Sequence, residues 1–544
     1  MKKITKIFTI ILATVCLLSS CEDNFNPQIY GTLNPTNYPT TEAEYESFMM
    51  LCYSPFTSLN TYWMGAGATS NQFSWYTAPG GIMRLFDTTS DNTAPWEYGW
   101  GGGWYYYSKA DFNECVYATR TLSDPNPSHF AKTAEVSYIT YVIGMLEKAP
   151  ESILPEAKKK ALLGETRLLR GLMSYYLLHL YGPVALIMNP DDVSVEDKLK
   201  EVERPTLQQM TEWITADFDY AYNNIPETQA EKGRYNRDYA RVCIMRHSLN
   251  EGSYMSGYYQ KAIDMYNELK GKYSLFTHSG NSYAEVFKVA NEFNNEIIMA
   301  ISCDPNATGG STGGNANPYV FYMIPSNAAG LDDKGEPTPF YPMGAGWGQV
   351  FNIAPKYYDT FDAADKRRET ILDRYYNTGG VWVDRNTTNW DGFVINKYPV
   401  ESNTYMQGTD IPLARWADVL LMYAEADVRN SNTPSAAAIG AVNEVRNRAG
   451  LKNLPASATS SKDAFLDAIL VERGHELFYE GMRKIDLIRF NRYAQEVYKT
   501  KGVKPTHQYI PLPNYVVEAA ESYGKVLTQT YERDGWQADL AAAK

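Results

Sequence analysis

The sequence predicts a mainly α-helical protein in which tetratricopeptide-like helical repeats support a loop-rich, aromatic face. Along most of the chain, apolar residues recur at helical spacing, which places them on one side of a helix. Short turns separate consecutive helical stretches, and this favours stacked helix pairs, although no consensus of about 34 residues recurs. Two aromatic-rich stretches, residues 57–103 and 303–355, lack the periodicity, and the second is also rich in Gly, Asn and Pro.

Residues 1–20 have the features of a lipoprotein signal peptide. Three lysines precede an apolar run over residues 7–18, which is too short for a spanning helix of about 20 residues. Residues 18–21, Leu-Ser-Ser-Cys, resemble a lipobox, so we expect cleavage before Cys21 and acylation of its thiol. No later run reaches about 18 apolar residues, which leaves the acyl chains as the expected membrane attachment.

The longest helix is expected over residues 158–181. Its apolar stripe ends at Gly182-Pro183 and consists of Leu162, Leu169, Met173, Tyr176 and Leu180. A second stripe consists of Leu413, Ala417, Leu420, Ala424 and Val428. Shorter helical patterns lie at residues 105–122, 137–148, 207–223, 238–249, 258–269 and 435–449. Residues 460–463 resemble a capping box that opens a helix containing Phe465, Ile469 and Leu477.

Composition narrows the possible ligands. The chain of 544 residues has a net charge of −13, which argues against nucleic acid and against docking on anionic lipid. Its 43 tyrosines and 11 tryptophans carry amphipathic rings that suit wet interfaces and carbohydrate stacking.

Four cysteines remain after Cys16 leaves with the signal peptide and Cys21 is acylated. They are Cys52, Cys115, Cys243 and Cys303, and the sequence does not choose among their three possible pairings. Cys115 and Cys243 lie in helical patterns, which is equally compatible with buried thiols. Scattered histidines and the lack of a CxxC motif give no zinc-site spacing, so no metal or cofactor is expected.

Three motifs bear on catalysis, and none predicts it. Residues 309–313 match G-x-S-x-G, but a nucleophile elbow requires a strand running into a helix. His475-Glu476 lacks a second histidine four residues later, which a zincin needs. A pair of carboxylates could hydrolyse a glycoside, but the sequence singles out no pair. We therefore expect a protein that is not an enzyme, with a surface glycosidase as the catalytic alternative.

Residues 472–489 interleave charged and apolar residues. On one continuous helix, Glu476 and Glu480 would be neighbours, as would Glu480 and Arg483. A catalytic role is one interpretation. An ion-pair network that clamps helices together is the favoured one, because the forked guanidinium of arginine satisfies half-buried carboxylates.

This block resembles the C-terminal signature of the SusD/RagB family of Bacteroidetes outer-surface lipoproteins. Further stretches agree with the family in order and spacing, at residues 167–182, 415–426, 443–450 and 510–513. Gly474-His475 stand where the family would have arginines, a departure that we expect to loosen the ion-pair network. The resemblance covers essentially the whole mature chain, which we divide into residues 21–250 and 251–544, the latter including the loop 303–355.

The resemblance implies a helical binding protein that forms a lid over a SusC-like TonB-dependent transporter. Family members pass glycans, or in some cases peptides, to the transporter, and their signature helices are scaffold. Glu22-Asp23 resemble a surface-export signal. The expected location is therefore the outer membrane, with Cys21 as the anchor and the protein facing the cell exterior.

Sugar recognition needs flat aromatic faces and a few fixed polar groups, and the two irregular stretches supply both. The first contains Trp63, Trp75 and Asp87, and the second contains Tyr319 and Tyr341. The residues selected as candidate ligand contacts are Arg84, Asn92, Trp96, Trp100, Trp104, Tyr322 and Trp347. Glycines flank Trp100 and Trp347, which favours their exposure, whereas the alternative for any of these rings is packing beneath the loops.

The leading hypothesis is that this protein binds a glycan and delivers it to the transporter. Peptide or protein capture is the alternative of the same class, and a surface glycoside hydrolase is the alternative from another class. A third alternative is a structural partner of the transporter with no ligand site of its own.

Overall fold

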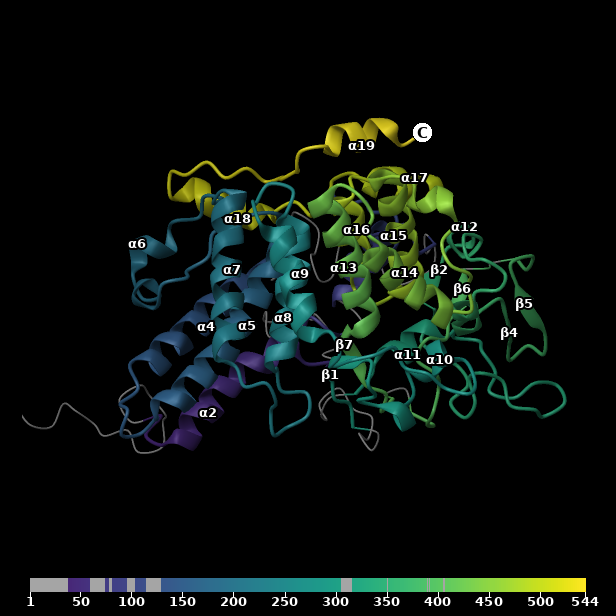
Figure 1. The fold of residues 1–544 in the computed structure, drawn as a ribbon, viewed down its shortest axis with the longest axis horizontal. Helices are drawn as coiled ribbons and strands as arrows, with labels where there is room; N and C mark the ends of the chain where they lie inside the picture. The colour runs from purple at the N-terminus through teal and green to yellow at the C-terminus, as the bar shows by residue number, and fades with distance from the viewer. Residues whose placement is uncertain are drawn as a thin grey trace, which may run out of the picture.

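Helices are the main regular elements of the structure, as predicted, and the short strands lie between the middle of the molecule and one of its ends (Figure 1). The computed structural model describes residues 38–58, 74–77, 81–94, 103–113, 129–304, 316–349, 351–388, 390, 392–404 and 407–544. Cys21 and the signal peptide lie outside these ranges. Among the described helices, none is long and apolar enough to cross a membrane.

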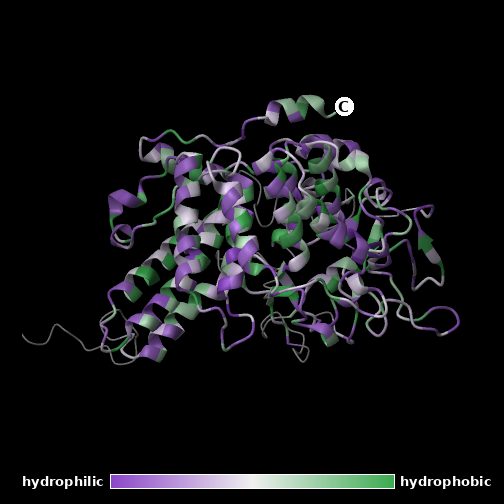
Figure 2. Cartoon of the chain, viewed as in Figure 1, coloured by the Kyte–Doolittle hydropathy of each residue, from purple (hydrophilic) through white to green (hydrophobic). Residues whose placement is uncertain are grey.

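The long helices pack in sequence order into a layered array. The helices α4 (Lys132–Glu147), α5 (Glu156–Tyr181), α7 (Leu207–Asn224), α8 (Arg237–Glu251) and α9 (Tyr258–Leu269) each contact the next. The array continues from α9 to α13 (Trp416–Ser431), which also contacts α14 (Ala436–Arg448) and α15 (Lys462–Glu476). Figure 2 shows hydrophobic and hydrophilic residues alternating along these helices, as expected when one side of each helix faces a neighbour.

The predicted helices largely form, with two corrections. Residues 207–223, 238–249, 258–269 and 435–449 correspond to α7, α8, α9 and α14. The stripe that begins at Leu413 is only partly helical, because Leu413 lies in a strand and α13 starts at Trp416. The helix expected over residues 105–122 ends early as α3 (Gly103–Ser108), since Ala110 adopts a left-handed φ of 55°.

Short elements complete the fold. Strand β1 (Ile297–Ile301) pairs antiparallel with β7 (Ile411–Arg415). In a second sheet, β6 (Phe393–Ile395) lies between β2 (Asn352–Ile353) and β3 (Ile371–Leu372). In a third, β4 (Arg374–Tyr376) pairs with β5 (Trp382–Asp384). The remaining α-helices are α2 (Glu42–Met50), α6 (Glu196–Leu199), α10 (Ser282–Glu285), α11 (Tyr319–Met323), α12 (Pro355–Tyr358), α16 (Arg483–Arg489), α17 (Tyr493–Lys501), α18 (Asn514–Ser522) and α19 (Trp536–Ala542). Short 3₁₀- or π-helical segments include η1 (Leu51–Phe56), η3 (Met83–Thr88) and η7 (Lys366–Thr370).

The helix α5 has the extent that its stripe predicts, and the stripe residues are buried. It follows Pro155 and ends before Gly182, whose φ of 76° only glycine adopts readily. At its centre, the buried Arg170 donates to both carboxylate oxygens of Asp217 on α7, each at 2.7 Å. The two helices also approach closely at Gly171, where an added Cβ would lie 2.7 Å from the ring of Phe218.

Replacing Gly171 by leucine is expected to lower the free energy of unfolding by about 1–3 kcal/mol, because the added side chain forces α5 and α7 apart. Urea denaturation measures the effect. Gly440→Leu is the matched control, since an added Cβ at this helical glycine would meet no atom within 4 Å. Equal losses in the two variants would contradict the close packing at Gly171.

The described cysteines form no disulfide with one another. Cys52, Cys243 and Cys303 are buried free thiols, and Cys115 lies outside the described ranges. Burial raises the pKa of the Cys243 thiol to about 12, so it remains protonated and behaves as a small apolar core residue.

Candidate functional site

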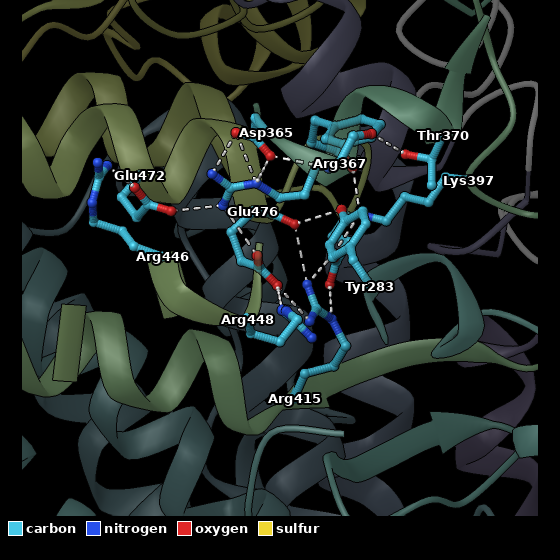
Figure 3. Close-up of polar contacts among 12 residues, drawn as sticks. Tyr283, Asp365, Arg367, Thr370, Lys397, Arg415, Arg446, Arg448, Glu472 and Glu476 are labelled. Atoms are coloured by element: carbon cyan, nitrogen blue, oxygen red, sulfur yellow. Dashed lines mark hydrogen bonds and ion pairs between the residues drawn. The ribbon is translucent and has the colours of Figure 1, made fainter. Parts of the chain in front are cut away.

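A buried ion-pair network joins the charged C-terminal block to the rest of the scaffold (Figure 3). At its centre, Arg415 donates to Glu296 (2.6 Å), Glu476 (2.9 Å) and Glu480 (2.6 and 3.0 Å). Arg367 donates to Glu476 (3.2 Å) and to further carboxylates of the same network. None of these five side chains is more than 9% exposed.

The remaining cations of the network are Arg446, Arg448 and Lys397. Arg448 pairs with Glu476 and with Glu296 (2.9 Å), and Lys397 pairs with Glu480 (2.6 Å). Arg446 pairs with Glu472 at 2.9 Å.

Ionisation of these carboxylates follows from their partners. Burial alone would raise the pKa of Glu476, but the guanidinium groups of Arg448, Arg415 and Arg367 outweigh it and hold the pKa below its usual value. A carboxylate that is buried, ionised and saturated by arginines is not accessible to a substrate. The interpretation of residues 472–489 as an ion-pair clamp is therefore confirmed.

The geometry of this block differs from a single helix. The helix α15 ends at Glu476, and the chain turns through Tyr479 (φ 54°) and Gly481 (φ 79°) before α16 begins at Arg483. Arg483 therefore pairs with Asp91 through two 2.8 Å contacts and not with Glu480, so the prediction that Glu480 and Arg483 share a helical face was wrong. Because of this turn, residues 472–489 can form ion pairs with several segments that are distant in the sequence.

Gly474 and His475 do not loosen the network. A Cβ at Gly474 would lie 2.5 Å from the Tyr357 hydroxyl and 2.7 Å from the Arg483 guanidinium, so glycine makes room for both. His475 stacks on Phe361 with ring centroids 3.8 Å apart. Burial lowers the pKa of His475 well below its usual value, which keeps the ring neutral among the arginines.

The two irregular stretches meet on this scaffold. The Ala354 amide donates to the Asn92 carbonyl, and the Ala94 amide donates to Oδ1 of Asn352, each at 2.9 Å. The Tyr319 hydroxyl also donates to the Tyr76 carbonyl at 2.7 Å. Residues distant in sequence thus form one region, as a shared ligand face requires.

Three of the candidate ligand contacts are buried, which corrects their assignment. Arg84 and Tyr322 are each 1% exposed, and Asn92 is 0% exposed. The Arg84 guanidinium lies over the Phe351 ring at 5.2 Å, and Asn92 donates to Asp87 at 3.3 Å. These polar groups stabilise the junction between the two stretches and are not displayed at the surface.

Trp96 and Trp100 lie outside the described residues, and of Trp104 the structure shows only that its backbone belongs to α3. Trp75 is fully buried and stacks on His129, with ring centroids 4.9 Å apart. Packing beneath the loops, the alternative considered for each ring, is therefore correct for Trp75.

Trp347 and Phe321 form a half-buried aromatic pair in the second stretch. Their ring centroids lie 5.8 Å apart, and the Trp347 amide donates to the Phe321 carbonyl at 2.8 Å. Tyr322 lies beside them, its ring 6.3 Å from that of Trp347. A Cβ at Gly346 would lie 2.4 Å from the Ile324 carbonyl oxygen, so the glycine permits the close turn that positions Trp347. This pair is the described part of the candidate ligand face.

A strongly exposed tryptophan on a strand was not anticipated. Trp382 is 46% exposed on β5, and Tyr341, which was considered but not selected, is 51% exposed. A hairpin signal was present, because Gly379-Gly380 separate two short runs of β-forming residues.

A hollow of about 450 Å³ lies where the two stretches begin. Thr57 and Ser302 line it together with Tyr53, Phe56 and Arg234. Arg234 is already engaged by Glu165 (2.8 Å) and Glu46 (2.5 Å). The Arg234 guanidinium therefore stabilises the fold, and the hollow is a weaker ligand candidate than the aromatic pair.

The chain is similar in sequence to known proteins. The model of the SusD family matches residues 360–523. A SusD-like protein from Bacteroides ovatus is 26% identical over 386 residues, which cover 66% of this chain and 64% of the relative. The starch-binding protein SusD from Bacteroides thetaiotaomicron is 27% identical over 394 residues, covering 61% and 65%. The chain thus spans slightly less than two thirds of each relative's length.

Surface glycan-binding protein A from Bacteroides fluxus has the same fold. Its structure superposes with a TM-score of 0.69 at 19% identity, covering 91% of this chain and 100% of that one. The helical array, the C-terminal sequence blocks and these similarities agree. In sequence and in fold, the chain is therefore similar to proteins of the SusD/RagB family.

Proposed function

We propose that this protein is a cell-surface lipoprotein that binds a glycan and delivers it to a partner TonB-dependent outer-membrane transporter. Similarity to the SusD/RagB family and the glycan-binding names of two similar proteins support the ligand class. The single observation in the structure that supports it most is the half-buried Phe321–Trp347 pair in the second irregular stretch. Cys21 would anchor the protein in the outer membrane, facing the exterior.

The electrostatics of the chain favour a neutral glycan. With a net charge of −13, the protein repels a polyanionic polysaccharide. The main arginine-rich cluster, around Arg415, is buried and paired, so it offers no surface for anionic groups. Neutral pyranose rings instead present C–H faces that pack on aromatic rings such as that of Trp347.

Affinity electrophoresis of the purified protein against a panel of neutral and acidic polysaccharides tests the ligand. We expect retardation by at least one neutral polysaccharide and none by acidic ones. Binding of oligopeptides without any glycan would overturn the proposal in favour of peptide capture, and release of reducing sugar would favour a hydrolase. Co-purification of a TonB-dependent transporter from solubilised membranes would support delivery.

A further inference from the structure

The β4–β5 ribbon displays an aromatic platform outside the Phe321–Trp347 pair, formed by the exposed ring of Trp382 on the buried Tyr376, which is 6% exposed. Its register places Tyr376 opposite Trp382, with ring centroids 5.4 Å apart on the same face. Trp382 is 46% exposed, although a large apolar ring at the surface contributes little to folding. Val381, the residue before Trp382, is 54% exposed as well, so the hairpin displays two neighbouring apolar side chains. Grouped exposed apolar side chains are typical of a contact with something outside the chain.

The opposite face of the ribbon anchors the platform. Tyr375 and Val383 are 7% and 6% exposed there, and the Tyr375 hydroxyl donates to Asn327 at 3.0 Å. The Ala329 amide also donates to the Tyr376 carbonyl at 2.9 Å. The ribbon is thus fixed to the second irregular stretch, and Trp382 is presented by a preorganised support.

Arg374 adds polar groups to the platform. Its guanidinium carbon lies 4.6 Å from the centroid of the Trp382 ring, a cation–π contact that orients the indole. Within the part of the chain that the structure describes, this guanidinium has no ion-pair or hydrogen-bond partner. Its N–H groups are therefore available to donate to hydroxyl oxygens beside the indole.

A continuous segment links the platform to the candidate ligand face. Eight residues lead from Phe321, which contacts Trp347, to Ala329, which bonds β4. At the limit of about 3.5 Å per residue, these two positions are less than about 28 Å apart. One extended polymer could therefore contact both sites.

We infer that Trp382 and Arg374 form a second contact for the same glycan chain, an inference that rests on the proposed function. The surroundings favour a sugar over a protein partner. Charged residues of both signs are exposed in the hairpin and in the segment that precedes it, among them Asp333, Lys334 and Asp373. A stable protein interface buries more than about 1,000 Å² around an apolar centre, whereas a sugar needs one aromatic ring and a few hydroxyl partners.

Trp382→Ala tests this inference when a polysaccharide and its shortest binding oligosaccharide are compared. Calorimetry should show about tenfold weaker binding of the polysaccharide, the loss expected for one stacking contact. Affinity for the short ligand should stay unchanged, because one site suffices to hold it. Arg374→Ala should weaken polysaccharide binding in the same direction.

Tyr523→Ala is the matched control. Tyr523 is 48% exposed just after α18, which lies at the far side of the molecule from β4 and β5 in Figure 1. Unchanged polysaccharide affinity in Trp382→Ala, with the wild type binding normally, would overturn this inference alone. Loss of a co-purifying transporter without loss of glycan binding would also overturn it and assign the platform to a protein contact. A wild type that binds no glycan would overturn the proposed function itself.

Discussion

Replacing Arg415 by methionine is expected to lower the free energy of unfolding by about 3–5 kcal/mol. The substitution keeps much of the side-chain volume but removes the positive charge shared by Glu296, Glu476 and Glu480. These carboxylates are 0%, 0% and 9% exposed, so water cannot replace the lost guanidinium. Buried negative charge left without its partner is among the costliest changes a fold can undergo.

Guanidinium chloride denaturation followed by circular dichroism measures the loss. Arg385→Met is the matched control, because Arg385 pairs with Asp359 at the surface, where the side chains are 40% and 54% exposed. Exposed pairs contribute at most about 1 kcal/mol. If Arg415→Met accumulates too little folded protein, Arg415→Lys retains the charge and should show a smaller loss in the same direction. Equal midpoints for the wild type and both Arg415 variants would show that the network does not stabilise the fold.

Trp347→Ala is expected to weaken glycan binding at least about tenfold, as loss of a central stacking ring would. We expect this loss because Trp347 is part of the candidate ligand face. Trp347 belongs to the half-buried aromatic pair of the second irregular stretch, and its ring centroid lies 5.8 Å from that of Phe321. Isothermal titration calorimetry with the polysaccharide identified by electrophoresis measures the change.

Trp213→Ala controls for loss of a half-buried tryptophan. Trp213 lies on α7, in the helical array, and packs partly against the core. Both variants should lose some stability, but only Trp347→Ala should lose affinity. Full glycan binding by Trp347→Ala would remove the aromatic pair from the ligand site.

The spacing of apolar residues predicted the helical array, because a helix that buries one face needs apolar residues at helical spacing along that face. The stripe of α5 is an example, since each of its residues is buried as expected. The break after Glu476 was not predictable in the same way. It depends on the left-handed backbone conformation of Tyr479, which no local sequence pattern predicts. It also depends on a buried hydrogen bond from the Gly481 amide to Asp87.

The candidate site was harder to predict than the scaffold. Polar residues in a loop can line a ligand site or make contacts with other buried groups inside the protein. Their spacing in the sequence does not distinguish these two roles. Arg84 and Asn92 are buried side chains inside the protein. Arg84 contacts the Phe351 ring, and Asn92 donates to Asp87. The glycines beside Trp347 predicted its exposure only in part, because the tight turn at Gly346 leaves the ring half-buried against Phe321 and Tyr322.

The salt bridge between Asp91 and Arg483 has a consequence for the order of folding. Its partners are separated by 392 residues, so most of the polypeptide must be synthesised before the bond can form. Until then, a native-like N-terminal portion would bury the Asp91 charge without its partner, which disfavours early collapse. A chain that stops short of Arg483 should therefore remain open and be vulnerable to proteases, which would couple survival of the protein to completion of its synthesis.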